Sequence, residues 1–111
     1  MEIVQSTIDG YSVVAIDGEV DLNSSPQLRK VFEDLLKKGA KKIIVDFAKV
    51  VYIDSSGLAT LIEMRQKLKK DKGQVFLTSM SEKIKSLFEI TKLDKIFTIC
   101  RNQEEALTIV G

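Results

Sequence analysis

The sequence predicts a single α/β domain over residues 1–111, with a mixed, mostly parallel sheet of about four to five strands and about four helices. Its length of 111 residues is typical of one domain. Two strand-like segments open the chain, and strand-like and helix-like segments then alternate. The apolar, β-branched run of residues 42–47 has the pattern of a strand buried on both faces of a parallel sheet.

Two strands and a helix are predicted for the first third of the chain. Residues 2–8 and 11–16 are rich in β-branched residues, and Asp9-Gly10 between them favours a tight hairpin turn. Ser25 can cap a helix whose first residue is Pro26, the helical position that tolerates proline. This helix has an apolar stripe at helical spacing, formed by Leu28, Val31, Phe32, Leu35 and Leu36.

The middle of the chain repeats the order of strand, loop and helix. The buried run 42–47 is followed by the shorter apolar segment 50–53. Asp54-Ser55-Ser56-Gly57 then opens a second helix, which we expect to end near Lys72-Gly73. Its apolar stripe is formed by Leu58, Leu61, Ile62 and Leu68.

The last third adds two more strand-like and two more helix-like segments. Residues 74–77 predict a strand, and Ser79 with Glu82 has the capping-box spacing that opens a third helix. Residues 96–99 predict a last strand. Asn102 and Glu105 have the same spacing, which predicts a terminal helix.

Composition excludes several classes of function. The sequence has no histidine and one cysteine, Cys100, so a Ser-His-Asp triad, a Cys-His pair and a structural zinc site are excluded. We expect no catalytic residue, no metal and no cofactor. Cys100 follows an apolar strand and is interpreted as a buried small hydrophobe.

The charge pattern argues against nucleic-acid and membrane partners. The net charge is +1, and aromatic content is 6% with no tryptophan. A basic cluster late in the second helix is interpreted as a solvated face; it comprises Arg65, Lys67, Lys69, Lys70 and Lys72. Because the start of the chain lacks a signal sequence and no stretch approaches about 20 apolar residues, we expect a cytoplasmic protein without membrane insertion.

The loop Asp54-Ser55-Ser56-Gly57 is the candidate functional site. In open α/β sheets, functional groups lie on loops after the carboxyl ends of strands, where helix N-termini also point. Free N–H groups and the helix dipole there would stabilise a phosphate on Ser55 or Ser56. Gly57 would leave the hydroxyls accessible to a kinase. Asp21 and Ser24 would lie at the same end of the sheet if their strand runs parallel to the strand before Asp54.

Two other interpretations of this loop remain open on chemistry alone. Asp54, Ser55 and Ser56 are favoured N-cap residues and could only cap the second helix. A catalytic serine would need a base, which only a carboxylate or a lysine could supply here. A serine hydrolase would therefore need an unusual base.

The chain resembles the STAS domain proteins, and in particular the bacterial anti-sigma factor antagonists. The resemblance spans nearly the whole chain and is specific because four segments occur in the same order and spacing. These are Gly18-Glu19-Val20-Asp21, Val45-Asp46-Phe47, Ile53-Asp54-Ser55-Ser56-Gly57-Leu58 and the segment from Leu87 to Phe97. The sequence departs from many relatives at Lys92, where they have glycine.

The resemblance implies a non-enzymatic switch. The unphosphorylated form would bind an anti-sigma factor and release the sigma factor, and that anti-sigma factor, a serine kinase, would inactivate it by phosphorylating Ser55. A metal-dependent serine phosphatase would reverse the step, and the free protein would be a monomer. The resemblance further implies that the phosphorylated serine is surrounded by a partner-binding surface that includes Asp21, Ser24, Asp54, Ser56 and Gly57.

A second function is compatible with the same resemblance. The chain could be a STAS scaffold in a multi-protein signalling complex, or an accessory subunit of a lipid or anion transporter. An elongated multimer, or copurification with membrane subunits, would distinguish these from the antagonist.

Overall fold

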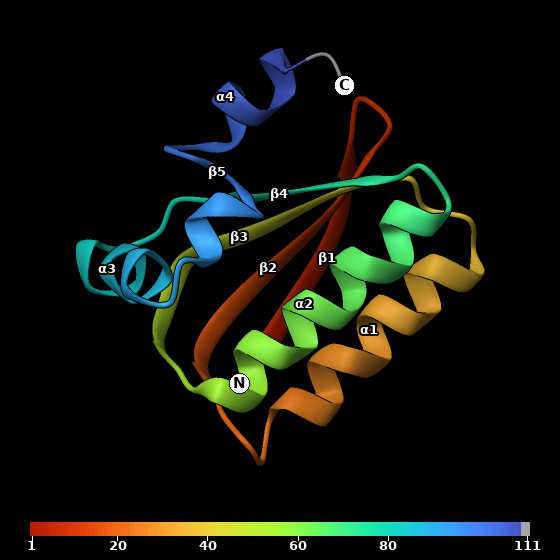
Figure 1. Ribbon diagram of the computed structural model, residues 1–111. Helices are drawn as coiled ribbons and strands as arrows, with labels where there is room; N and C mark the ends of the chain where they lie inside the picture. Colours follow the sequence, from red (N-terminus) through yellow and green to blue (C-terminus); the bar gives the residue numbers. More distant parts are fainter. Residues whose placement is uncertain (110–111) are drawn as a thin grey trace.

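The computed structural model describes residues 1–109 and contains one five-stranded sheet with helices on both faces (Figure 1). The strands lie in the order of the sequence and are β1 (Glu2–Ile8), β2 (Tyr11–Val20), β3 (Lys42–Ile53), β4 (Gln74–Thr78) and β5 (Thr98–Cys100). The helices are α1 (Ser25–Lys37), α2 (Ser55–Lys70), α3 (Glu82–Ile90), a 3-10 turn η1 (Leu93–Lys95) and α4 (Gln103–Thr108). The predicted fold class is confirmed.

The sheet is mixed because only its first strand runs antiparallel. β1 pairs with β2 through a turn at Asp9 and Gly10, whose φ angles of 49° and 84° are both left-handed. This is the hairpin geometry that an Asp-Gly pair favours. β2, β3, β4 and β5 are parallel neighbours.

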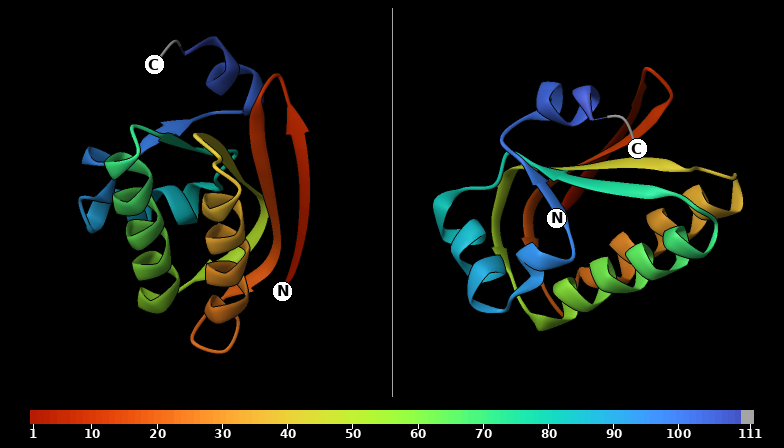
Figure 2. Two further views of the ribbon diagram at one scale, coloured as in Figure 1. Left: turned by 90° about the vertical axis from the view of Figure 1, so that its right-hand side faces the viewer. Right: turned by 45° about the horizontal axis from the view of Figure 1, so that its top comes forward.

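Helices α1, α2 and α3 cover one face of the sheet, and α4 covers part of the other (Figure 2). β3 therefore sends alternate side chains into two cores: Val45 packs under α1 to α3, and Ile44 packs under α4. On the first face, Phe88 of α3 makes edge contacts with Phe47 and Phe97, with ring centroids 6.0 Å apart in each pair. The prediction that the run 42–47 is buried on both faces is confirmed for Ile43, Ile44, Val45 and Phe47, whereas Lys42 is exposed and Asp46 half-buried.

Two strands extend further than predicted. β2 continues to Val20 and β3 to Ile53, and their late portions pair with each other through two register shifts. On the other side of β3, β4 pairs with residues 42–46 alone, the first part of that strand. The extension carries the chain directly to Asp54. The last strand begins later than predicted, because Phe97 turns into the core before β5 starts.

Two predicted helix starts are wrong by one or two residues. α1 is preceded by Ser24, so Ser25 is its first residue and Pro26 its second. Ser79 does not cap α3: it has a left-handed φ of 63°, and Ser81 accepts the bond from the Ile84 N–H. The Asn102 cap of α4 is confirmed by its 2.9 Å bond from the Glu105 N–H.

Within residues 1–109, no helix has both the length and the apolar character needed to cross a membrane. The longest helix, α2, has 16 residues and carries a basic last turn.

Candidate functional site

The ends of β2 and β3 bring two loops together at one end of the molecule. Val20 and Ile53 are register partners at the parallel strand ends, and the Asp54 N–H donates to the Val20 carbonyl oxygen at 3.0 Å. The loops that follow lead into α1 and α2, which begin side by side at the lower end of Figure 1. The expectation that residues 21–24 lie on the same side as Asp54 is therefore confirmed.

Asp54 is the N-cap of α2. Its Oδ1 accepts hydrogen bonds from the Ser56 N–H at 2.9 Å and the Gly57 N–H at 3.2 Å. The same oxygen accepts from the Ser56 hydroxyl at 2.6 Å. This hydroxyl is the main reason that the pKa of Asp54 lies below its usual range; desolvation opposes the shift, and the two N–H groups add to it.

This cap corrects the expectation that free N–H groups would receive a phosphate. The N–H groups of Ser56 and Gly57 are already bound by the Asp54 carboxylate. A phosphate on Ser55 would instead meet the helix dipole, which attracts it, and the Asp54 charge, which repels it. The capping interpretation is confirmed for Asp54.

The two serines differ in their surroundings. Ser55 is exposed, and within residues 1–109 its hydroxyl makes no hydrogen bond. Ser56 is half-buried, donates its hydroxyl proton to Asp54, and its carbonyl oxygen accepts from the buried Thr60 hydroxyl at 3.0 Å. Ser55 is therefore the serine whose hydroxyl is free to react.

Gly57 has a different role from the predicted one. It is buried, and a Cβ atom at this position would lie 2.7 Å from side-chain carbons of both Ile53 and Val20. The glycine therefore lets α2 approach the ends of β2 and β3 closely, instead of clearing the surface beside the hydroxyls. The prediction that Gly57 keeps the serine hydroxyls accessible to a kinase is therefore wrong.

Asp21 and Ser24 close the neighbouring loop on itself. Asp21 Oδ1 accepts from the N–H groups of Asn23 and Ser24, both at 3.0 Å. The Ser24 hydroxyl lies 2.8 Å from the Glu19 carbonyl oxygen, to which it donates, and accepts from the Asp21 N–H at 2.9 Å. These bonds explain why the Ser24 side chain does not cap α1, and they fix the shape of the loop beside Asp54.

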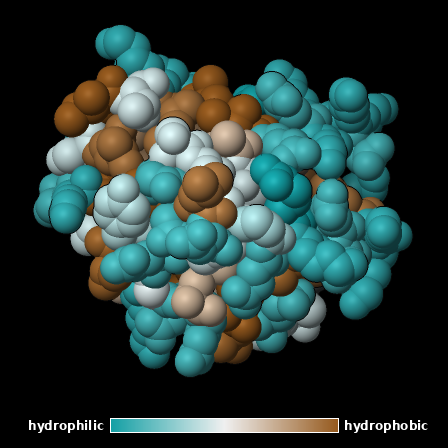
Figure 3. Space-filling view, turned by 90° about the horizontal axis from the view of Figure 1, so that it is seen from below, coloured by the Kyte–Doolittle hydropathy of each residue, from teal (hydrophilic) through white to brown (hydrophobic). Residues whose placement is uncertain are grey.

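Leu22 was missed as a site residue. It lies in this loop with 74% of its surface exposed, and its backbone contributes to the lowered pKa of Asp54, so it is close to the cap. Seen from below, this end of the molecule shows hydrophobic patches among hydrophilic surface, with the largest patch on the side of α3 (Figure 3). The sequence offered one signal for Leu22: it is an apolar residue between Asp21 and Asn23, in an otherwise polar loop.

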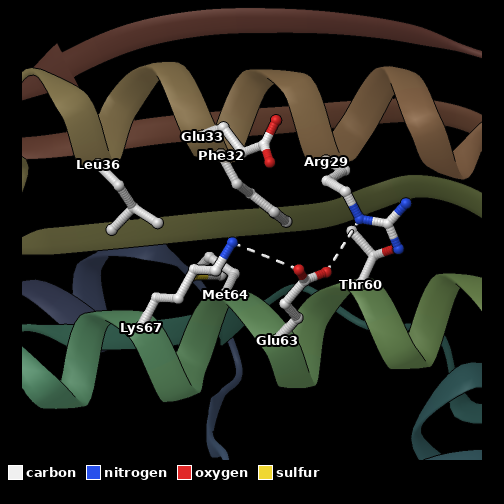
Figure 4. Close-up of a pocket in the computed structure, with 8 residues that line it drawn as sticks. All are labelled: Arg29, Phe32, Glu33, Leu36, Thr60, Glu63, Met64 and Lys67. Carbon is white, nitrogen blue, oxygen red and sulfur yellow. Dashed lines mark hydrogen bonds and ion pairs between the residues drawn. The ribbon is translucent and has the colours of Figure 1, made fainter.

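A groove between α1 and α2 is bridged by one ion pair, Arg29–Glu63 (Figure 4). Glu63 accepts from Arg29 Nε at 2.9 Å and pairs with Lys67 Nζ at 3.3 Å. The Arg29 guanidinium, followed by Lys67, holds the pKa of Glu63 below its usual range. Phe32 and Met64, both buried, fill the space between the helices. These contacts and the Arg29–Glu63 pair hold α2 against α1 and leave no room for a ligand.

The basic cluster is partly used within the fold. Lys67 pairs with Glu63, and Arg65 Nε donates to the Ile96 carbonyl oxygen at 2.8 Å.

Cys100 is buried, and burial raises the pKa of its thiol, as expected for a packing residue. No group of three or more potential metal ligands occurs in the described part of the chain.

The fold and the serine-bearing helix start define a family. The STAS domain model matches residues 2–106, so the chain belongs to the STAS domain family. An anti-sigma-B factor antagonist of Staphylococcus aureus is 28% identical over 104 residues, which are 94% of this chain and 96% of that protein.

Solved structures agree with this assignment. An anti-sigma factor antagonist from Mycobacterium paratuberculosis is 26% identical, with a TM-score of 0.88 over 96% of this chain and 91% of that one. The phosphorylated form of the Bacillus cell fate determinant SpoIIAA is 22% identical, with a TM-score of 0.75 over 96% of both chains. The latter likeness concerns the fold alone.

Proposed function

We propose that this chain is an anti-sigma factor antagonist that phosphorylation of Ser55 switches off. Its unphosphorylated form binds an anti-sigma factor that is also a serine kinase, and thereby releases the sigma factor. A metal-dependent serine phosphatase restores the active form. The protein is a cytoplasmic monomer in its free state and has no catalytic activity of its own.

The observation that carries the proposal is the free, exposed hydroxyl of Ser55 at the start of α2. Phosphorylation moves the γ-phosphoryl group of ATP to Ser55 Oγ: the Oγ–P bond forms, the bond to ADP breaks, and a general base of the kinase accepts the hydroxyl proton. The product carries about 1.5 to 2 additional negative charges at this point. A partner surface that covers the site would have to desolvate this charge, which opposes binding.

The neighbouring apolar surface supports a protein partner. Leu22 is 74% exposed beside the Asp54 cap, where burial against a partner would remove apolar surface from water. The conformation of its loop is fixed by Asp21 and Ser24, so little ordering is required on binding. Asp21, Ser24, Asp54, Ser56 and Gly57 accordingly shape the binding surface around Ser55.

The environment of the serines argues against a hydrolase. The only carboxylate bonded to a serine hydroxyl in the Asp54 to Gly57 loop is Asp54, and its lowered pKa makes it a weak base. The serine that it contacts is Ser56, which is the less exposed of the two.

The test is phosphorylation by the serine-kinase anti-sigma factor of the source organism, with Mg²⁺ and ATP. Mass spectrometry should place one phosphate on Ser55, and the phosphorylated protein should lose its affinity for that anti-sigma factor. Ser55→Ala should remain bound in the presence of ATP. A phosphate found only outside Ser55, or equal binding by both forms, would contradict the proposal.

A further inference from the structure

Two adjacent serines stand at the start of α2, and a kinase that modifies only one of them needs a physical basis for the choice. Both have the same side chain, and both lie within the first turn of the helix. Their surroundings differ through one residue, Asp54, which contacts Ser56 twice.

Ser56 is held at three points. Its N–H and its hydroxyl both donate to Asp54 Oδ1, at 2.9 Å and 2.6 Å. Its carbonyl oxygen accepts from the Thr60 hydroxyl at 3.0 Å, and Thr60 is 1% exposed. Since the hydroxyl bond is short and its acceptor is a carboxylate with a lowered pKa, the bond is charge-assisted.

We propose that Asp54 is the residue that restricts phosphoryl transfer to Ser55, because it holds the hydroxyl of Ser56. This inference rests on the proposed function. To accept the γ-phosphoryl group of ATP, a serine Oγ must lie in line with the phosphorus atom, form the new Oγ–P bond and give its proton to a general base of the kinase, while the bond to ADP breaks. Ser55 can do this from its exposed position, whereas Ser56 must first break its bond to Asp54 and turn outward.

Asp54 is thus a positioning residue that acts through Ser56. The expected discrimination is about tenfold or more in phosphorylation rate, as for the loss of one charge-assisted hydrogen bond. Without the Asp54 carboxylate, Ser56 would be the second hydroxyl of an exposed helix start and would become available.

The first experiment compares Ser55→Ala with the double variant Ser55→Ala/Asp54→Ala, each incubated with the serine-kinase anti-sigma factor, Mg²⁺ and ATP. Mass spectrometry should find almost no phosphate on Ser56 in the single variant and a clear gain in the double variant. The matched control is Ser55→Ala/Asn102→Ala. Asn102 also caps a helix, since it accepts the Glu105 N–H at the start of α4, but it does not contact Ser56, so this control should remain unlabelled.

The outcomes separate this inference from the proposed function. Wild-type protein that takes no phosphate at Ser55 would overturn the proposed function, and this inference with it. Rapid labelling of Ser56 in the Ser55→Ala variant would overturn this inference alone. A folded double variant that stays unlabelled, or an Asn102 control that gains label equally, would do the same.

A second measurement needs neither a kinase nor a variant at Asp54. NMR titration of the Asp54 carboxyl group in the wild type and in Ser56→Ala tests the bond itself. We expect the pKa of Asp54 to rise in Ser56→Ala, because its strongest hydrogen-bond donor is lost. An unchanged pKa would show that the Ser56 hydroxyl is not held, and would overturn the inference even if the double variant does not fold.

Discussion

The Asp54 N–H donates a hydrogen bond to the Val20 carbonyl oxygen at 3.0 Å, which ties the first turn of α2 to the end of β2. Val20 is also the last residue of β2, so the loop of residues 21–24, which carries Leu22, begins directly after the residue to which the start of α2 is bonded. A partner that binds over Ser55 therefore meets the Leu22 loop and the start of α2 as one surface.

Replacing Leu22 by serine should weaken binding to the anti-sigma factor without loss of stability. Burying a leucine side chain contributes about 1.5–3 kcal/mol, or roughly 10- to 150-fold in affinity. The side chain is 74% exposed in the free protein, so the fold loses little. Calorimetric titration and thermal melting measure the two effects. Val4→Ser, on the edge strand β1 with 64% exposure, is the control that should bind normally.

Ser55→Asp should abolish most partner binding while changing the melting temperature by less than about 3 °C. The new charge is attracted by the helix dipole and repelled by Asp54, and solvent screens both effects at this exposed position. Thermal melting of Ser55→Asp beside Ser55→Ala measures the difference. A large loss of stability in Ser55→Asp alone would show that Ser55 matters chiefly to the helix start.

Gly57→Ala should destabilise the protein by about 1–3 kcal/mol, since its Cβ would overlap Ile53 and Val20. Helix propensity alone predicts the opposite sign, because alanine is the better helix former by about 1 kcal/mol. Chemical denaturation decides between packing and propensity. An unchanged or higher free energy of unfolding would mean that α2 does not lie this close to the strands.

Lys92→Gly should stabilise the protein by up to about 1 kcal/mol. Lys92 follows α3 with a left-handed φ of 64°, a conformation that glycine adopts without the steric penalty of a side chain. Lys92→Ala is the matched control and should bring no such gain in denaturant unfolding. Equal effects of the two replacements would contradict the backbone explanation.

The Arg29–Glu63 pair should contribute stability at neutral pH that is lost in acid. Because the folded pKa of Glu63 is lowered, its contribution is complete above the usual value of 4.5 and is lost as the pH falls through the lowered pKa. Solvent screening limits it to less than about 1 kcal/mol, since both side chains are about 40% exposed. The difference in unfolding free energy between wild type and Glu63→Gln should therefore shrink as the pH falls from 7 to 3. A constant difference would contradict this.

Local sequence signals predicted most of the fold. The Asp9-Gly10 turn, the apolar stripe of the first helix and the Asn102 cap depend on a few neighbouring residues, and all three occur as expected. The starts of α1 and α3 were misplaced. The Ser24 hydroxyl donates to the Glu19 carbonyl oxygen near the end of β2, and the Ser79 N–H donates to the Cys100 carbonyl oxygen of β5. Such choices depend on bonds to the rest of the chain, which spacing alone does not reveal.

For the site, the sequence by itself determined that Asp54 to Gly57 forms a helix start and that two serines stand there, because capping preference is a local property. Only the tertiary structure decided that Gly57 faces the strand ends, that Leu22 lies beside the cap, and that Asp54 holds Ser56 and leaves Ser55 free. The physical reason is that the first two features depend on the parallel pairing of β2 with β3, whereas the third depends on the side-chain conformations that Asp54 and Ser56 adopt at the helix start. The pairing of the two strands joins segments more than 30 residues apart in the sequence, such as Val20 and Ile53.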